Sequence, residues 1–81
     1  MENNKTTSQR ILEIYELANE HFGDAEYVGL KYDEFDGWVC YIKFHKNSRV
    51  DFLSTSDEMP RTALEKLKKR VENIIARYNV A

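Results

Sequence analysis

Few residues of this chain have the types and spacing that catalysis or metal binding requires. His21 and His45 are far apart in sequence, and neither has a second ligand at the helical or hairpin spacing typical of zinc sites. The single cysteine, Cys40, alternates with Trp38 and Ile42, which predicts a buried small hydrophobic side chain rather than an exposed thiol beside a cation. These residues therefore predict neither a metal site nor a nucleophilic thiol.

Acidic and hydroxyl side chains gather in two short segments, and neither has the pattern of a ligand-binding loop. Asp33, Glu34 and Asp36 fall in one turn without the twelve-residue pattern of a calcium loop, so we interpret them as solvated turn residues. The segment LSTSDE, residues 53–58, contains hydroxyls but no glycine-rich loop to bind phosphate. A small chain also has little core from which to build a water-excluding pocket. We therefore expect a non-enzymatic protein with no cofactor.

The clearest candidate for binding is a row of cations near the end of the chain. The segment EKLKKRVENIIARY, residues 65–78, has five basic and two acidic residues. Helical spacing places one set of its polar residues on a single side, here called the basic stripe: Lys66, Lys69, Arg70, Asn73 and Arg77. Such a stripe can follow a phosphate backbone. It can also be the solvated side of an amphipathic helix, as a Glu65–Lys69 pair four residues apart indicates. We favour the solvated or partner-facing interpretation.

The first helix is predicted near the N-terminus, where apolar residues recur at steps of three and four. The helical segment is TTSQRILEIYELANEHFG, residues 6–23. Thr6 and Gln9 have the spacing of a capping box, and Gly23 follows the last apolar residue as a C-terminal cap. We expect residues 1–7 to form a flexible N-terminus and residues 8–81 to form a single domain.

After this helix the apolar period changes to two, which predicts three strands. They are expected at residues 26–33, 37–45 and 48–54, followed by a loop over residues 54–60. The residues expected to face the core are Val28, Leu30, Tyr32, Trp38, Cys40, Ile42, Phe44, Val50 and Phe52. We expect Tyr32 to lie opposite Trp38, with Gly37 at a positive φ, and Phe44 to lie opposite Val50.

The last helix follows Pro60, which a helix tolerates only in its first turn. Apolar residues with helical spacing continue from Leu64 to Tyr78. The complete order is helix, three strands, helix. The sequence therefore predicts an α+β domain, α-β-β-β-α, in which two helices pack on one face of a three-stranded antiparallel meander.

The other face of the predicted sheet combines aromatic side chains with cations. It is expected to present Tyr27, Lys31, Val39, Tyr41, Lys43, His45, Arg49 and Leu53. Aromatic rings beside cations can stack the bases of a single-stranded nucleic acid. Tyrosine and arginine are also favoured anchors of protein interfaces, and strands on a half-exposed sheet are rich in such residues without any ligand. Of the two binding interpretations, we favour a protein or self interface.

The charge is unevenly distributed along the chain. Residues 1–60 contain 6 Lys/Arg and 12 Asp/Glu, a net of −6, whereas residues 61–81 contain 6 and 2, a net of +4. The hydrophobic fraction of 42% is sufficient for a packed core, although a small core also favours self-association. No apolar run has membrane-spanning length or the form of a secretory signal, so we expect no membrane association and a cytoplasmic protein.

The predicted order of elements is similar to that of double-stranded-RNA-binding domains over residues 8–78. That family binds RNA through a lysine pair at the start of its second helix, after a glycine-rich turn. The corresponding positions here are Glu58, Met59, Pro60 and Arg61, and only Arg61 has the expected charge. The chain also resembles small acidic cytoplasmic proteins of bacteriophages and mobile elements, through the segment PRTALEKL, residues 60–67. This resemblance implies an accessory or inhibitory binding role.

Together these patterns predict an interaction module that binds a protein partner or a copy of itself. The candidate binding residues are Lys66, Lys69, Arg70, Arg77, Tyr27, Lys31, Tyr41, Lys43 and Arg49. The alternative is a nucleic-acid-binding domain that uses the basic stripe, with the aromatic sheet face as a surface for base stacking.

Overall fold

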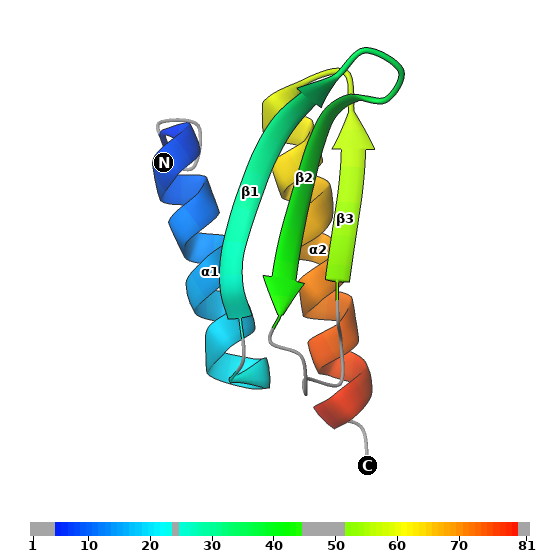
Figure 1. Ribbon diagram of the computed structural model, residues 1–81. Coiled ribbons are helices and arrows are strands. Elements are labelled where there is room, and N and C mark those ends of the chain that lie inside the picture. The colour runs from blue at the N-terminus through cyan, green and yellow to red at the C-terminus, as the bar shows by residue number, and fades with distance from the viewer. Residues whose placement is uncertain (1–4, 24, 45–51, 80–81) are drawn as a thin grey trace.

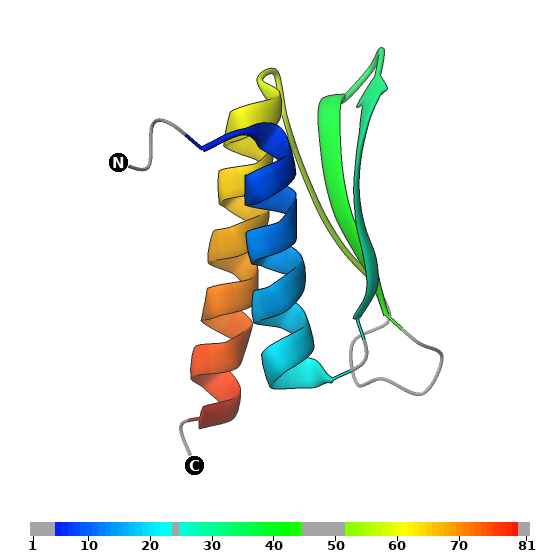
Figure 2. The same cartoon turned by 90° about the vertical axis from the view of Figure 1, so that its left-hand side faces the viewer.

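Two helices lie side by side on one face of a three-stranded sheet (Figure 1). The structure is a computed structural model that describes residues 5–23, 25–44 and 52–79. Its elements are α1 (Thr7–Phe22), β1 (Ala25–Asp33), β2 (Gly37–Phe44), β3 (Phe52–Asp57) and α2 (Pro60–Asn79). The strand order is β1-β2-β3, and both neighbouring pairs are antiparallel. The predicted α-β-β-β-α order and the packing of both helices on one face are confirmed (Figure 2).

The ends of α1 are set by local hydrogen bonds that its sequence predicts. Oγ1 of Thr6 accepts from the backbone N–H of Gln9 at 3.1 Å, and Oε1 of Gln9 accepts from the N–H of Thr6 at 2.8 Å. This reciprocal pair is a capping box. At the other end Gly23 has a φ of 77°, and its N–H donates to the carbonyl of Asn19 at 2.8 Å. A left-handed residue of this kind ends the helix without steric cost only if it is glycine.

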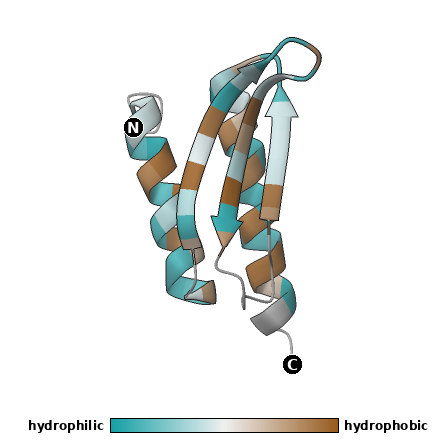
Figure 3. Ribbon diagram, in the orientation of Figure 1, coloured by the Kyte–Doolittle hydropathy of each residue, from teal (hydrophilic) through white to brown (hydrophobic). Residues whose placement is uncertain are grey.

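The core lies between the helices and the sheet. Its buried side chains are Ile14, Ala18, Ala25, Cys40, Ile42, Phe44, Leu53, Ala63, Leu64, Leu67 and Val71. Figure 3 shows how apolar positions alternate with polar ones along β1 and β2. No polar or charged residue within the described ranges is buried. Each fully buried leucine or isoleucine stabilises the fold by roughly 1.5–3 kcal/mol, so the apolar face of α2 is a main source of stability.

The register between β1 and β2 agrees with the prediction. Tyr32 lies opposite Trp38 and Asp33 opposite Gly37, whose φ is 81°. Tyr32 lies on the same face of β1 as Val28 and Leu30, as predicted, but its side chain is 65% exposed instead of buried. Tyr32 lies next to the turn that follows β1, and its ring contacts the half-buried Trp38 edge-on at a centroid distance of 5.5 Å.

The third strand ends later in the chain than predicted. β3 is Phe52–Asp57, so the prediction of a loop over residues 54–60 is wrong for its first four residues, and residues 48–51 of the expected strand lie outside the described residues. Polarity suggested a loop, but a polar residue can occupy a strand when its hydrogen bonds are satisfied. Thr55 meets this condition, because its hydroxyl donates to the backbone carbonyl of Ala63 in α2 at 2.7 Å.

The register of β3 also differs, by one residue. The predicted pairing of Phe44 with Val50 directs Phe52 into the core and Leu53 out of it, whereas Ile42 in fact lies opposite Leu53. Leu53 is 5% exposed and Phe52 is 55% exposed. A shift of one residue exchanges the two faces of a strand. Because both neighbours are apolar, the alternation fits either register, and strand pairing decides between them. Val50 lies outside the described residues.

Candidate binding surface

The face of the sheet that points away from the helices is the best candidate for a binding surface. Its residues, here called the open face, are Tyr27, Gly29 and Lys31 of β1, Val39, Tyr41 and Lys43 of β2, and Phe52, Ser54 and Ser56 of β3. Both helices lie on the opposite side of the sheet, and no described element covers the open face (Figure 2).

Three aromatic side chains from three strands meet on the open face. The Tyr41 ring contacts Tyr27 edge-on, at a centroid distance of 6.1 Å and an interplanar angle of 84°. On its other side it lies near-parallel to Phe52, at 5.9 Å and 22°. Tyr27 is 46% exposed and Phe52 is 55% exposed. This group, here called the aromatic cluster, presents rigid apolar surface to solvent at the cost of few rotatable bonds.

Gly29 makes room for the ring at the centre of the aromatic cluster. It lies opposite Tyr41 in the β1–β2 pairing. A Cβ atom at position 29 would be 2.7 Å from Cε2 of Tyr41, and closer still to Cζ. The Tyr41 ring therefore lies across the backbone of Gly29. A glycine inside a strand is expected where a bulky group approaches the backbone this closely.

The open face is positively charged although the whole chain has a net charge of −2. Lys31 and Lys43 are exposed there, and none of its nine residues is acidic. Nζ of Lys31 lies 5.8 Å from the centroid of the Tyr41 ring, in the range of a cation–π contact. The next β1 residue in the same alternation is Asp33. Its Oδ1 already accepts from the backbone N–H groups of Phe35 at 2.8 Å and Asp36 at 3.2 Å.

One cation of the basic stripe is held by the end of β3. Nζ of Lys66 lies 2.9 Å from Oδ1 of Asp57 and donates to the carbonyl of Ser56 at 3.2 Å. The hydrogen bond from Lys66 lowers the pKa of Asp57 below its ordinary value, and a bond from the N–H of Met59 adds to this. Lys66 therefore links α2 to an edge strand. Lysine beside an edge strand also discourages pairing with another chain.

The other cations of the basic stripe remain exposed on α2. Among the described residues, Lys69, Arg70 and Arg77 form no ion pair. The predicted Glu65–Lys69 pair is not formed. Oε1 of Glu65 instead lies 3.3 Å from Nε of Arg61 and 3.6 Å from a guanidinium nitrogen of Arg10 in α1.

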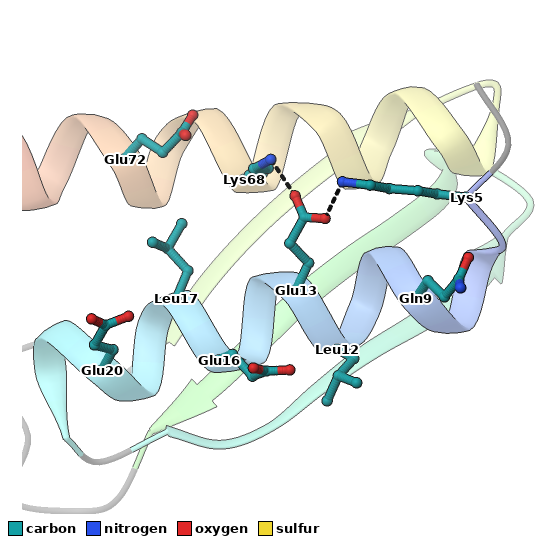
Figure 4. Close-up of a pocket in the computed structure, with 9 residues that line it drawn as sticks. All are labelled: Lys5, Gln9, Leu12, Glu13, Glu16, Leu17, Glu20, Lys68 and Glu72. Atoms are coloured by element: carbon teal, nitrogen blue, oxygen red, sulfur yellow. Dashed lines mark hydrogen bonds and ion pairs between the residues drawn. The ribbon is translucent and has the colours of Figure 1, made fainter. Parts of the chain in front are cut away.

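A second charged cluster links the two helices. Figure 4 shows the carboxylate of Glu13 between Lys68 of α2 and Lys5, and both lysines form ion pairs with it. The hydrogen bonds from Lys5 and Lys68 lower the pKa of Glu13 from 4.5 to about 2, and the bond from Lys5 has the larger effect. The cluster lies in a groove of about 570 Å³ whose other acidic lining residues are Glu16, Glu20 and Glu72.

The residues considered for catalysis or metal binding lie in separate parts of the fold. Cys40 is fully buried, as predicted, and burial raises the pKa of its thiol to about 12. The turn hydrogen bonds described above lower the pKa of Asp33, so its carboxylate organises the turn that follows β1. His21 is exposed in the last turn of α1.

Comparisons with known proteins give no relatives. No family model, curated protein or solved structure matches this chain. Within the described ranges, neither helix has the length and apolar character needed to cross a membrane.

The structure brings together five of the eight residues that the sequence predicted for this face. Tyr27, Lys31, Val39, Tyr41 and Lys43 lie on one face, as predicted. Leu53 was expected there and is buried instead, and Phe52 takes part in its place.

Arg49 and His45 lie outside the described residues. Sequence reasoning missed Gly29, although a glycine that alternates with Tyr27 and Lys31 inside a strand pattern is a recognised signal of close approach by another group.

Proposed function

We propose that this protein is a non-enzymatic interaction module that binds a protein partner through its open face. The observation that supports this proposal is the aromatic cluster, which stays exposed on a sheet face that no described element covers. Aromatic residues carry much of the binding energy at protein interfaces, because they bury a large area with little loss of conformational entropy. The small accessory or inhibitory proteins that the chain resembles through its PRTALEKL segment are also expected to act by binding a partner and not by catalysis.

The proposal is tested with a variant that removes the exposed rings and leaves the core intact. Tyr27→Thr with Phe52→Thr replaces two half-exposed side chains with a residue that suits strands. The matched control is Phe35→Thr, which removes an 88% exposed ring from the turn outside the open face. Partners are captured from a cell extract, purified and mixed again with each variant, and backbone hydrogen exchange locates the contact.

The outcomes of this experiment separate the alternatives. We expect the double variant to lose the partner and Phe35→Thr to keep it, with exchange protection in β1, β2 and β3. Protection confined to α2, or equal loss in both variants, would contradict the proposal. Sedimentation at two protein concentrations tests whether the open face binds a second copy of this chain instead of a partner protein. A dimer that the double variant abolishes would replace the proposed partner protein with a copy of this chain.

Nucleic-acid binding through the basic stripe is a second candidate function. It is favoured by Lys69, Arg70 and Arg77, which are exposed and form no ion pair in the described part of the chain. The α-β-β-β-α order of double-stranded-RNA-binding domains adds to it. The stripe belongs to α2, on the covered side of the sheet, so a strand bound there would not reach the aromatic cluster (Figure 2). Its test is a salt series with generic duplex RNA and single strands. Binding that falls steeply with salt and is weakened by Lys69→Glu with Arg70→Glu would support it, and no binding at low salt would exclude it.

A further inference from the structure

We infer that the open face binds an acidic extended segment of its partner, in which two carboxylates four residues apart flank an apolar side chain. This inference rests on the proposed function and adds the chemistry of the partner. The evidence is the arrangement of the open-face residues in rows that run across the three strands. The first row contains Lys43 between Tyr27 and Phe52, the second contains Tyr41, and the third contains Lys31.

The spacing of these rows sets the pattern of the segment. Successive rows are two residues apart along the strands, so the Lys43 row and the Lys31 row are separated by about 13 Å. The Tyr41 row lies midway between them. An extended segment presents its side chains i, i+2 and i+4 on one face with the same spacing. Carboxylates at i and i+4 therefore reach the two lysines, while an apolar side chain at i+2 packs on the exposed ring of Phe52, beside Tyr41.

Charge favours an acidic partner over a second copy of the chain. Face-to-face pairing of two copies would bring four lysines into one interface, and the nine residues of the open face supply no carboxylate to pair with them. Oδ1 of Asp33, next in the alternation, accepts two hydrogen bonds within its own turn, and Lys31 of the same chain also helps to lower the pKa of this carboxylate. Like charges brought together in an interface oppose association. An acidic segment meets the same lysines with a favourable interaction.

The position of Lys31 also favours a peptide over a nucleobase. Its ammonium lies over the Tyr41 ring, on the surface that a stacked base would need. A carboxylate that pairs with Lys31 leaves this cation–π contact in place. The partner is therefore expected to add an ion pair at this position instead of displacing the lysine.

The inference is tested with fluorescent nine-residue peptides and the full-length chain at low ionic strength. The first peptide has glutamate at positions 3 and 7, leucine at position 5 and serine or threonine elsewhere. The matched peptide has glutamine at positions 3 and 7. We expect the acidic peptide to bind and the glutamine peptide to bind about tenfold more weakly, since two partly exposed ion pairs are lost. Amide chemical shifts should change in β1, β2 and β3.

Charge reversal supplies the decisive control. We expect Lys31→Glu with Lys43→Glu to lose the acidic peptide and to bind the same peptide with lysine at positions 3 and 7. Lys69→Glu with Arg70→Glu, a reversal of equal size on α2, should leave binding of the acidic peptide unchanged. Equal binding of the acidic and glutamine peptides, no binding of the acidic peptide, or its displacement by a tighter-binding single-stranded oligonucleotide would overturn the inference.

Two pairs of substitutions separate the contribution of the aromatic side chains of the open face from that of its lysines. If the captured partner is lost with Tyr27→Thr and Phe52→Thr but kept with Lys31→Gln and Lys43→Gln, the open face binds a protein without the predicted acidic segment. If neither pair of substitutions affects the partner, both proposals fall.

Discussion

Replacing Gly29 with alanine tests whether the Tyr41 ring lies on the backbone of β1 in solution. The added Cβ would overlap that ring, whose Cε2 atom would be 2.7 Å away. The backbone of Gly29 has no positive φ, so alanine fits the local conformation. Because the overlapping atoms belong to the outer end of a partly exposed side chain, the ring should rotate away from the sheet while the strand stays in place.

The expected change in the free energy of unfolding is the sum of one stabilising and one destabilising effect. Replacing glycine with alanine in a compatible strand position stabilises a protein by roughly 0.5–1 kcal/mol, because the unfolded chain loses freedom. Displacing the ring forfeits two aromatic contacts and one cation–π contact, each worth about 0.5 kcal/mol at an exposed site. The net change is a destabilisation of about 0.5–1 kcal/mol. In a Tyr41→Ser background there is no ring to displace, so Gly29→Ala should stabilise the protein by about 0.5–1 kcal/mol.

A double-mutant cycle measures this reversal of sign. The free energy of unfolding is obtained from urea denaturation of four proteins: the wild type, Gly29→Ala, Tyr41→Ser and the double variant. The single tryptophan, Trp38, reports unfolding because its side chain is half-buried. We expect a coupling energy of about 1.5 kcal/mol. If alanine at position 29 has the same effect in both backgrounds, the ring does not lie on Gly29, and the proposed geometry of the open face is refuted.

Three further predictions concern the charged clusters and the cysteine. The pKa of Glu13 is about 2 in the folded protein and 4.5 in the unfolded chain. Its ion pairs therefore contribute stability above pH 4.5, and this contribution is lost as the pH falls from 4.5 to 2. Because its side chain is about one-third exposed, this contribution is about 1 kcal/mol, and Glu13→Gln should remove that pH dependence from urea unfolding curves. Lys66→Ala should raise the pKa of Asp57 towards its ordinary value in a carbon-13 NMR titration, whereas Lys69→Ala should not. Cys40 should react with a thiol reagent at pH 8 more than about 100-fold more slowly in the folded protein than in urea.

Each of these predictions has an outcome that would contradict it. Unfolding curves of Glu13→Gln that keep the wild-type pH dependence would show that the link between α1 and α2 contributes nothing to stability. An unchanged Asp57 titration in Lys66→Ala would mean that the two side chains do not pair in solution. Equal rates of thiol modification with and without urea would place Cys40 at the surface.

Local patterns predicted the features that depend on neighbours in sequence. The capping box of Thr6 and Gln9 and the glycine that ends α1 are made by residues no more than four positions apart. The β1–β2 register follows from a short turn in which only Gly37 readily adopts the required positive φ. The composition of the strands also indicated that aromatic and basic residues share one face.

Tertiary pairing alone decided the features that involve distant segments. Phe52 and Leu53 fit the alternation equally well, and only the pairing of β3 with β2 selected which of them joins the aromatic cluster. Glu13 and Lys68 are 55 residues apart, so no local spacing indicates that they meet. Sequence periodicity states which residues share a face of one element. It does not state how two elements are aligned, because that alignment depends on the packing of all of them at once.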